Sequence, residues 1–135
     1  MKPQELKDKT KQFGIDVIRF SSGLPRNMSV YVMIKQLIRS ATSTGANYRA
    51  ACRARSRMEF IAKLGIVEEE ADESIYWMEL LVESGFVPYD KVSHLLKEAD
   101  EILSIIVSSI KTARLHSFQS PIRNPKSAID PSPNS

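Results

Sequence analysis

Residues 28–48, MSVYVMIKQLIRSATSTGANY, decide the fold of this chain. Apolar or small residues recur in this stretch at intervals of three, four and seven, which is the spacing of one face of a helix. They are Val30, Met33, Ile34, Leu37, Ile38, Ala41, Gly45 and Tyr48. A glycine inside a helix costs about 1 kcal/mol relative to alanine. At Gly45, therefore, either a neighbouring backbone comes close or the helix is bent.

Signals for helix ends and starts flank this stretch on both sides. Residues 4–20 show a second helical period, and SSGLPRN follows them. In that segment Gly23 can take the left-handed conformation after a helix end, and Asn27 offers an N-cap. Downstream, SRME forms a capping box in which the Ser56 hydroxyl accepts from the Glu59 amide. In this motif the Glu59 carboxylate reaches back to the amide of the cap residue.

Two more helices complete the pattern. A third apolar stripe runs from residue 56 to residue 84, where Gly85 is placed to close a Schellman motif. A fourth stripe runs from about residue 88 to about residue 115. Four amphipathic helices with short connections bury their stripes by packing against each other. The sequence therefore predicts an all-α fold, an antiparallel up-down-up-down four-helix bundle.

The prediction divides the chain into two parts. Residues 1–115 form the four-helix bundle domain. Residues 116–135, which include SPIRNPKSAIDPSPNS, are rich in proline and serine and hold few apolar groups. Such a segment cannot bury enough apolar surface to offset the entropy of ordering its backbone. We therefore predict a disordered C-terminal tail.

Composition narrows the class of protein. The chain has 135 residues, of which 42% are hydrophobic and 26% charged, as in ordinary globular domains. The single cysteine, Cys52, excludes an intrachain disulfide and fits a cytoplasmic location. The N-terminus has no apolar segment of the kind a secretory signal needs. The longest uncharged apolar run, residues 102–110, is about half the length that spans a bilayer. We expect a soluble protein without a membrane partner.

Charge is distributed unevenly along the chain. The net charge is +3. Residues 1–27 carry six positive and three negative groups, and residues 28–63 carry seven and one. Residues 64–101 carry two and eleven, and residues 102–135 carry four and one. The four segments therefore have net charges of +3, +6, −9 and +3, and local potential selects charged partners more than the total does.

The basic segment places arginines at the joint between the second and third helices: Arg49, Arg53, Arg55 and Arg57. Helix N-termini favour anions, so arginines beside Ser56 would reinforce a site for phosphate. We predict that RNA or DNA phosphates bind these four residues together with Lys35 and Arg39. The alternative is that exposed arginines only solubilise one end of the bundle. Tyr48 is either a stacking platform for a base or part of the core.

The acidic run EEEADE, residues 68–73, is most simply a solvated helix face. Alternatively, Glu69 and Glu73 meet arginines of the second helix or of a neighbouring subunit. Apolar residues beside the main seams, among them Ile105, are either scattered surface residues or a subunit contact. The predicted oligomer interface consists of Ile61, Glu69, Glu73, Tyr76, Trp77 and Leu80.

Catalytic and cofactor motifs are missing from the sequence. Neither His94 nor His116 has a glutamate three residues before it, as the di-iron bundles require. The glycines are isolated and form no phosphate-binding loop. Cys52 has no assignable general base and is most simply an incidental thiol. The sequence therefore predicts a protein that is not an enzyme and that uses no metal or other cofactor.

The stretch RSATSTGANYRAACRARSRMEFIAKLGIVEEEADESIYWMELL, residues 39–81, resembles a known family. These are the four-helix-bundle proteins encoded in intervening sequences of bacterial large-subunit ribosomal RNA genes, formerly mislabelled as ribosomal proteins. The resemblance spans residues 6–115 in pattern. Its specific residues are Ser40, Ala41, Ser43, Ala46, Asn47, Ser56, Glu59, Phe60, Glu73, Tyr76 and Trp77. Many members continue with an Ile-Ala-Glu-Gly turn where this chain has YRAA, as in a separate branch.

The resemblance implies an up-and-down bundle that assembles as a ring of five. Relatives include the accessory variability determinant of diversity-generating retroelements, a basic pentamer that engages a reverse transcriptase and nucleic acid. Two hypotheses follow for this chain. In the first, a pentamer binds RNA or DNA phosphates through the arginine joint, as an accessory factor to a reverse transcriptase. In the second, a protein-interaction adaptor uses its arginines and glutamates for subunit or partner contacts without nucleic acid.

Overall fold

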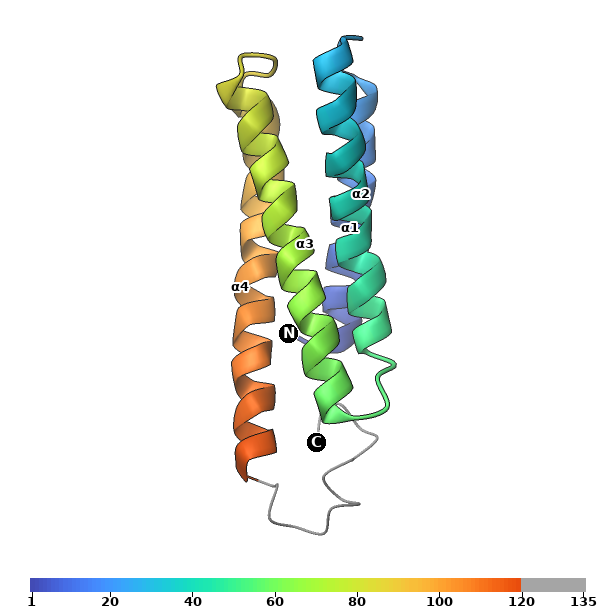
Figure 1. Cartoon of the computed structure of the whole chain (residues 1–135), viewed down its shortest axis with the longest axis vertical. Helices are drawn as coiled ribbons and strands as arrows, with labels where there is room; N and C mark the ends of the chain where they lie inside the picture. Colours follow the sequence, from blue (N-terminus) through green and yellow to red (C-terminus); the bar gives the residue numbers. More distant parts are fainter. Residues whose placement is uncertain (120–135) are drawn as a thin grey trace.

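The structure is a computed structural model that describes residues 1–119, with side chains through His116. Within these residues the chain forms α1 (Pro3–Ser22), α2 (Met28–Ala51), α3 (Arg57–Glu83) and α4 (Tyr89–Gln119). The helices run alternately up and down (Figure 1). Consecutive helices pack side by side, and α4 also packs against α1. The predicted all-α, up-down-up-down bundle is confirmed.

Each helix contributes one face to a common core. Among the largest fully buried side chains are Phe13 of α1, Leu37 of α2, Leu64 and Met78 of α3, and Ile102 of α4. Burying a side chain of this size stabilises the fold by about 1.5–3 kcal/mol. The core therefore follows the apolar stripes that the sequence predicts.

The predicted N-caps of α2 and α3 are confirmed. The Asn27 side chain accepts hydrogen bonds from the amides of Ser29 and Val30, at 2.9 and 3.3 Å. The Ser56 hydroxyl accepts from the Glu59 amide at 3.1 Å. The second half of the predicted capping box is wrong, because the Glu59 carboxylate accepts from the Arg55 amide instead, at 2.6 Å. This bond ties the α2–α3 connection to the first turn of α3.

The two predicted glycine helix ends have different outcomes. Gly85 has a φ of 84°, and the amide of Phe86 donates to the carbonyl of Leu81 at 3.1 Å, as in a Schellman motif. The left-handed conformation predicted for Gly23 is wrong, because its φ is −91°. There the Gly23 amide donates to the carbonyl of Phe20, so α1 ends in a tight turn that needs no left-handed residue.

Gly45 of α2 lies close to the backbone of α1. A Cβ built on Gly45 would lie 3.2 Å from the backbone oxygen of Thr10 and 3.3 Å from its carbonyl carbon. Of the two predicted explanations for this glycine, the close approach of a neighbouring backbone is therefore confirmed. The contact fixes the register of α1 against α2, and with it the side chains that face each other across this pair.

The fourth helix is longer than predicted, because it continues past Leu115 to Gln119. The remainder of the predicted C-terminal tail, residues 120–135, lies outside the described residues. No helix within residues 1–119 is both long and apolar enough to cross a membrane.

Candidate nucleic-acid interface

The joint between α2 and α3 lies at the lower end of the bundle (Figure 1). Its backbone is held by hydrogen bonds from the Arg53 and Ala54 amides to carbonyls of the last turn of α2, both at 3.0 Å. Ala54 is buried beneath the joint. Arg49, Arg53 and Arg55 are exposed around it, and none forms an ion pair with a carboxylate of the described residues. Three predicted site residues therefore present free cations at one end of the molecule.

Arg57 differs from this expectation. The sequence predicts an exposed arginine, whereas Arg57 is 6% exposed at the first position of α3. Its Nε atom has no hydrogen-bond partner among the described residues. Arg57 is therefore not presented to an external ligand on the surface of the single chain.

Tyr48 belongs to the core and not to the exposed surface. Its side chain is 6% exposed and packs in the main apolar cluster. Burial, followed by interaction with the neighbouring Cys52, raises the pKa of the Tyr48 phenol. Of the two alternatives for Tyr48, the structure therefore favours a core residue over a stacking platform.

Lys35 and Arg39 lie higher on α2 than the joint. Lys35 is exposed and lies fourteen positions before Arg49, which corresponds to roughly 21 Å of helix. Arg39 is ion-paired with Glu70 of α3 at 3.0 Å and also with Glu73. The hydrogen bond that the Arg39 guanidinium donates to the Glu73 carboxylate raises the pKa of Arg39. Neither residue joins the cluster of free arginines.

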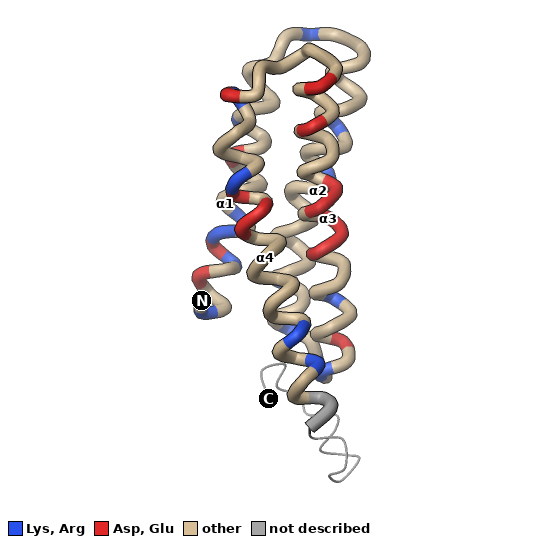
Figure 2. Tube along the Cα trace, turned by 90° about the vertical axis from the view of Figure 1, so that its left-hand side faces the viewer, with Lys and Arg blue, Asp and Glu red and all other residues tan. Residues whose placement is uncertain are grey.

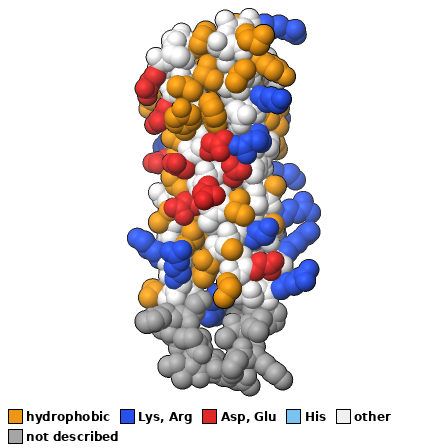
Figure 3. Space-filling model, viewed as in Figure 1, with side chains coloured by type: hydrophobic (Ala, Val, Ile, Leu, Met, Phe, Trp, Pro, Cys, Tyr) orange, Lys and Arg blue, Asp and Glu red, His pale blue; other side chains and the backbone are white. Residues whose placement is uncertain are grey.

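Most acidic residues of α3 lie in its middle and upper part, as the red segments of Figure 2 show, and Glu59 lies in its first turn at the lower end. In Figure 3, most red side chains lie over the middle of the face shown, and blue ones lie along the right-hand edge and at the lower left. The alternative that Glu73 meets an arginine of the second helix is supported, because it pairs with Arg39. The second carboxylate that pairs with Arg39 is that of Glu70 and not that of Glu69, which is exposed.

The predicted oligomer interface is mixed in exposure. Ile61, Trp77 and Leu80 are partly buried and pack against the core. Tyr76 is 53% exposed, and its ring meets that of Trp77 edge to face, with centroids 5.1 Å apart. The Trp77 indole nitrogen donates to the Glu73 carboxylate at 3.0 Å. These contacts fix an aromatic pair on the outer face of α3.

The Glu73 carboxylate carries a pH-dependent contribution to stability. Its hydrogen bond from Trp77, and then that from Arg39, lower the pKa of Glu73 below its ordinary value of 4.5. A lowered pKa in the folded state stabilises the protein above the unfolded-state pKa, and this contribution is lost as pH falls through the folded-state value.

We therefore expect Glu73→Gln to lower the free energy of unfolding by about 0.5 kcal/mol at pH 7, as for other exposed ion pairs, and to have little effect at pH 3. Urea denaturation at both pH values measures this difference. Glu69→Gln is the matched control, because Glu69 is exposed and forms no ion pair with the described residues. An equal loss at both pH values would show that the Glu73 charge contributes nothing.

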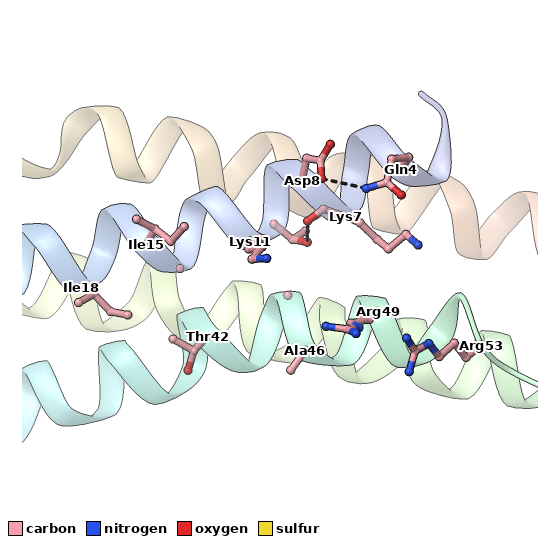
Figure 4. Close-up of a pocket in the computed structure, with 13 residues that line it drawn as sticks. Gln4, Lys7, Asp8, Lys11, Ile15, Ile18, Thr42, Ala46, Arg49 and Arg53 are labelled. Atoms are coloured by element: carbon pink, nitrogen blue, oxygen red, sulfur yellow. Dashed lines mark hydrogen bonds between the residues drawn. The ribbon is translucent and has the colours of Figure 1, made fainter.

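Two lysines of α1 that the sequence interpretation did not include lie across from the arginines. A groove of about 430 Å³ between α1 and α2 is lined by Lys7, Lys11, Arg49 and Arg53, and by Asp8. Figure 4 shows Lys7 and Lys11 on the side of α1 toward α2, Arg49 and Arg53 on α2, and Asp8 beside Gln4 on α1. Lys7 and Lys11 are one turn apart on the polar face of α1, and this spacing of two cations can be recognised in the sequence. Only the register fixed at Gly45 shows that this face meets Arg49 and Arg53.

The remaining chemistry of the described residues is limited. No group of three or more His, Cys, Asp or Glu side chains within residues 1–119 is placed to hold a metal ion. Cys52 is a half-buried free thiol. The features that stand out are the basic lower end, the acidic face of α3 and the aromatic pair of exposed Tyr76 and partly buried Trp77.

These features define an up-and-down four-helix bundle with oppositely charged surfaces. The model of the 23S rRNA-intervening sequence protein family matches residues 2–108, so the chain belongs to that family. A solved structure from Bacteroides thetaiotaomicron, described as a protein with unknown function from the S23 ribosomal protein family, is 37% identical to this chain. It superposes with a TM-score of 0.76 over 82% of this chain and 99% of its own length. No curated protein matches the chain. The family resemblance seen in the sequence is confirmed.

Proposed function

We propose that this protein is a non-catalytic homo-oligomer that binds nucleic-acid phosphates through Arg49, Arg53 and Arg55. The proposal depends on one observation: these guanidinium groups are exposed and form no ion pair with the described carboxylates, although α3 carries many. Arg39, in contrast, is already neutralised by two of them. Free arginines on a fixed backbone suit phosphate, because a guanidinium binds two phosphate oxygens at once.

The proposal predicts that binding is electrostatic. Each phosphate that the protein neutralises releases condensed counterions, so the logarithm of the affinity falls linearly with the logarithm of the salt concentration. With three arginines in contact, we expect a slope of about −2 for a single strand and about −3 for a duplex. Fluorescence anisotropy with labelled RNA and DNA oligonucleotides over a salt series measures it. No binding at low salt, or a slope near zero, would contradict the proposal.

The proposed assembly is a ring, most simply a pentamer as the family resemblance suggests. Tyr76, which is exposed and packs against Trp77 on α3, supports a subunit contact, because aromatic residues are enriched at interfaces. A ring would repeat the arginine joint around its axis and raise avidity for one polyanion. Multi-angle light scattering gives the copy number. A monomer at micromolar concentration would contradict this part of the proposal.

A role as accessory factor to a reverse transcriptase in the cytoplasm is the most specific form of the proposal. It is supported by the family resemblance. It is also supported by two separate surface regions, the arginine joint, which suits a polyanion, and the face of α3 around Tyr76, which suits a protein. Purification from the native host at moderate salt, with identification of the bound nucleic acid and proteins, tests it. Recovery of the protein with nucleic acid but without any polymerase would contradict this form.

The alternative is a protein-interaction adaptor that needs no nucleic acid. It is favoured by the pairing of Arg39 with Glu70 and Glu73, which shows that opposite charges of this chain do meet across helices. In an adaptor, ionic strength would change assembly or binding to a protein partner, and oligonucleotides would not bind. The salt series above, with scattering recorded in parallel, separates the two functions.

A further inference from the structure

The groove between α1 and α2 has two chemically different ends. Its lower end carries four cations, Lys7, Lys11, Arg49 and Arg53, against one carboxylate, Asp8. That carboxylate accepts a hydrogen bond from Gln4 at 2.9 Å and forms no ion pair with a described cation. The four cations likewise have no acidic partner among the described residues. Positive charge in this part of the groove is therefore available to a ligand.

The other end of the groove is apolar, and small residues line its base. Ile15 and Ile18 form its wall on α1, and Ile18 is 43% exposed. Small residues, Gly14, Thr42, Gly45 and Ala46, form the floor between the helices. A Cβ on Gly14 would already touch the backbone of Thr42 at 3.6 Å, so the floor is closed by backbone and not by bulky side chains. Figure 4 shows the isoleucines along α1 and the cations at the opposite end.

The size of the groove favours a single strand over a duplex. A volume of about 430 Å³ falls within the range of small-ligand sites, whose volumes start at about 300 Å³. A duplex keeps its bases stacked inside and would touch only the rim of such a groove. A single strand exposes its bases, and proteins that bind single strands combine a basic track for the backbone with an apolar surface for the bases.

We propose that this groove binds single-stranded nucleic acid, with phosphates on Lys7, Lys11, Arg49 and Arg53 and a base against Ile15 and Ile18. This inference rests on the proposed function and adds the form of nucleic acid and four ligand-contacting residues of α1. No aromatic residue lines the groove. The contact with the base is therefore aliphatic, and we expect weak discrimination among the four bases.

The first test compares strands and charges. Labelled single strands of RNA and of DNA, and duplexes of the same sequences, are titrated by fluorescence anisotropy. We expect both single strands to bind at least about 10-fold more tightly than their duplexes. Lys7→Ala/Lys11→Ala should reduce the salt slope for single strands by about 1.4. Lys91→Ala/Lys97→Ala, two exposed lysines of α4, is the control and should change neither quantity.

The second test fills the groove without changing charge. Ala46 is exposed on its floor, so Ala46→Phe should fold as the wild-type chain does, which circular dichroism checks. We expect about 10-fold weaker binding of single strands, with an unchanged salt slope.

Equal affinity of single strands and duplexes, or wild-type binding by both groove variants, would overturn the inference. The arginine contacts of the proposed function would still stand if Arg49, Arg53 and Arg55 remained necessary. A change of copy number in the Lys7→Ala/Lys11→Ala variant would also overturn it, by assigning the groove to a subunit contact.

Discussion

The triple variant Arg49→Ala/Arg53→Ala/Arg55→Ala should bind a single-stranded oligonucleotide about 10³-fold more weakly than the wild-type chain at about 50 mM salt. Each lost phosphate contact removes about 0.7 from the salt slope for a single strand, so the slope should fall by about 2. At this salt concentration, one contact corresponds to roughly 10-fold in affinity. All three side chains are exposed, so their truncation should leave the core unchanged. Anisotropy titrations at several salt concentrations measure both quantities.

A control with the same loss of charge separates local contact from net charge. Arg26, Lys91 and Lys97 are exposed in the first connection and on α4, away from the joint. Their simultaneous replacement by alanine changes the net charge by the same amount. We expect it to lower affinity several-fold at most. If both triple variants lost affinity equally, binding would follow the overall charge of the protein and not the arginine joint.

Gly45→Val should lower the free energy of unfolding by about 2 kcal/mol. A Cβ at this position lies 3.2 Å from the backbone oxygen of Thr10, and the added branches need more room than that. Backbone atoms in a packed helix cannot rotate away as a side-chain end can, so α1 and α2 must separate. Overpacking of this kind costs about 1–3 kcal/mol. Urea denaturation followed by circular dichroism measures the change.

Gly65 provides the matched control, because it lies inside α3 and a Cβ there would meet nothing within 4 Å. Gly65→Ala should therefore stabilise the protein by about 0.5–1 kcal/mol, the usual gain in helix propensity. The two glycines are predicted to respond with opposite signs. A stabilising effect of Gly45→Val would show that α1 and α2 are farther apart than the structure places them.

Local features of this fold could be predicted from the sequence because they depend on neighbouring residues. Asn27 and Ser56 cap their helices as predicted, and Gly85 closes α3 in the predicted conformation. The prediction for Gly23 was wrong because several turns can end a helix, and the energetic differences among them are small. For Glu59, the amide of Arg55 is only one residue farther along the chain than that of Ser56, and the path of the connection decides between them.

The candidate site could be predicted only in part because it depends on contacts between helices. The sequence placed Arg49, Arg53 and Arg55 at one end of the bundle, where the structure also has them. The burial of Arg57 depends on how the first turn of α3 is rotated toward its neighbours, which periodicity does not resolve at a helix end. The participation of Lys7 and Lys11 depends on the register of α1 against α2.

The central claim is that guanidinium groups at the α2–α3 joint are free to meet an external polyanion. Side-chain NMR of arginine Nε–H groups during titration with a single-stranded oligonucleotide tests it most directly, because each arginine reports separately. The account predicts that the signals of Arg49, Arg53 and Arg55 shift in a saturable manner, while those of ion-paired Arg39 and buried Arg57 stay in place. Shifts confined to Arg39, or no arginine shifts at saturating oligonucleotide, would contradict it.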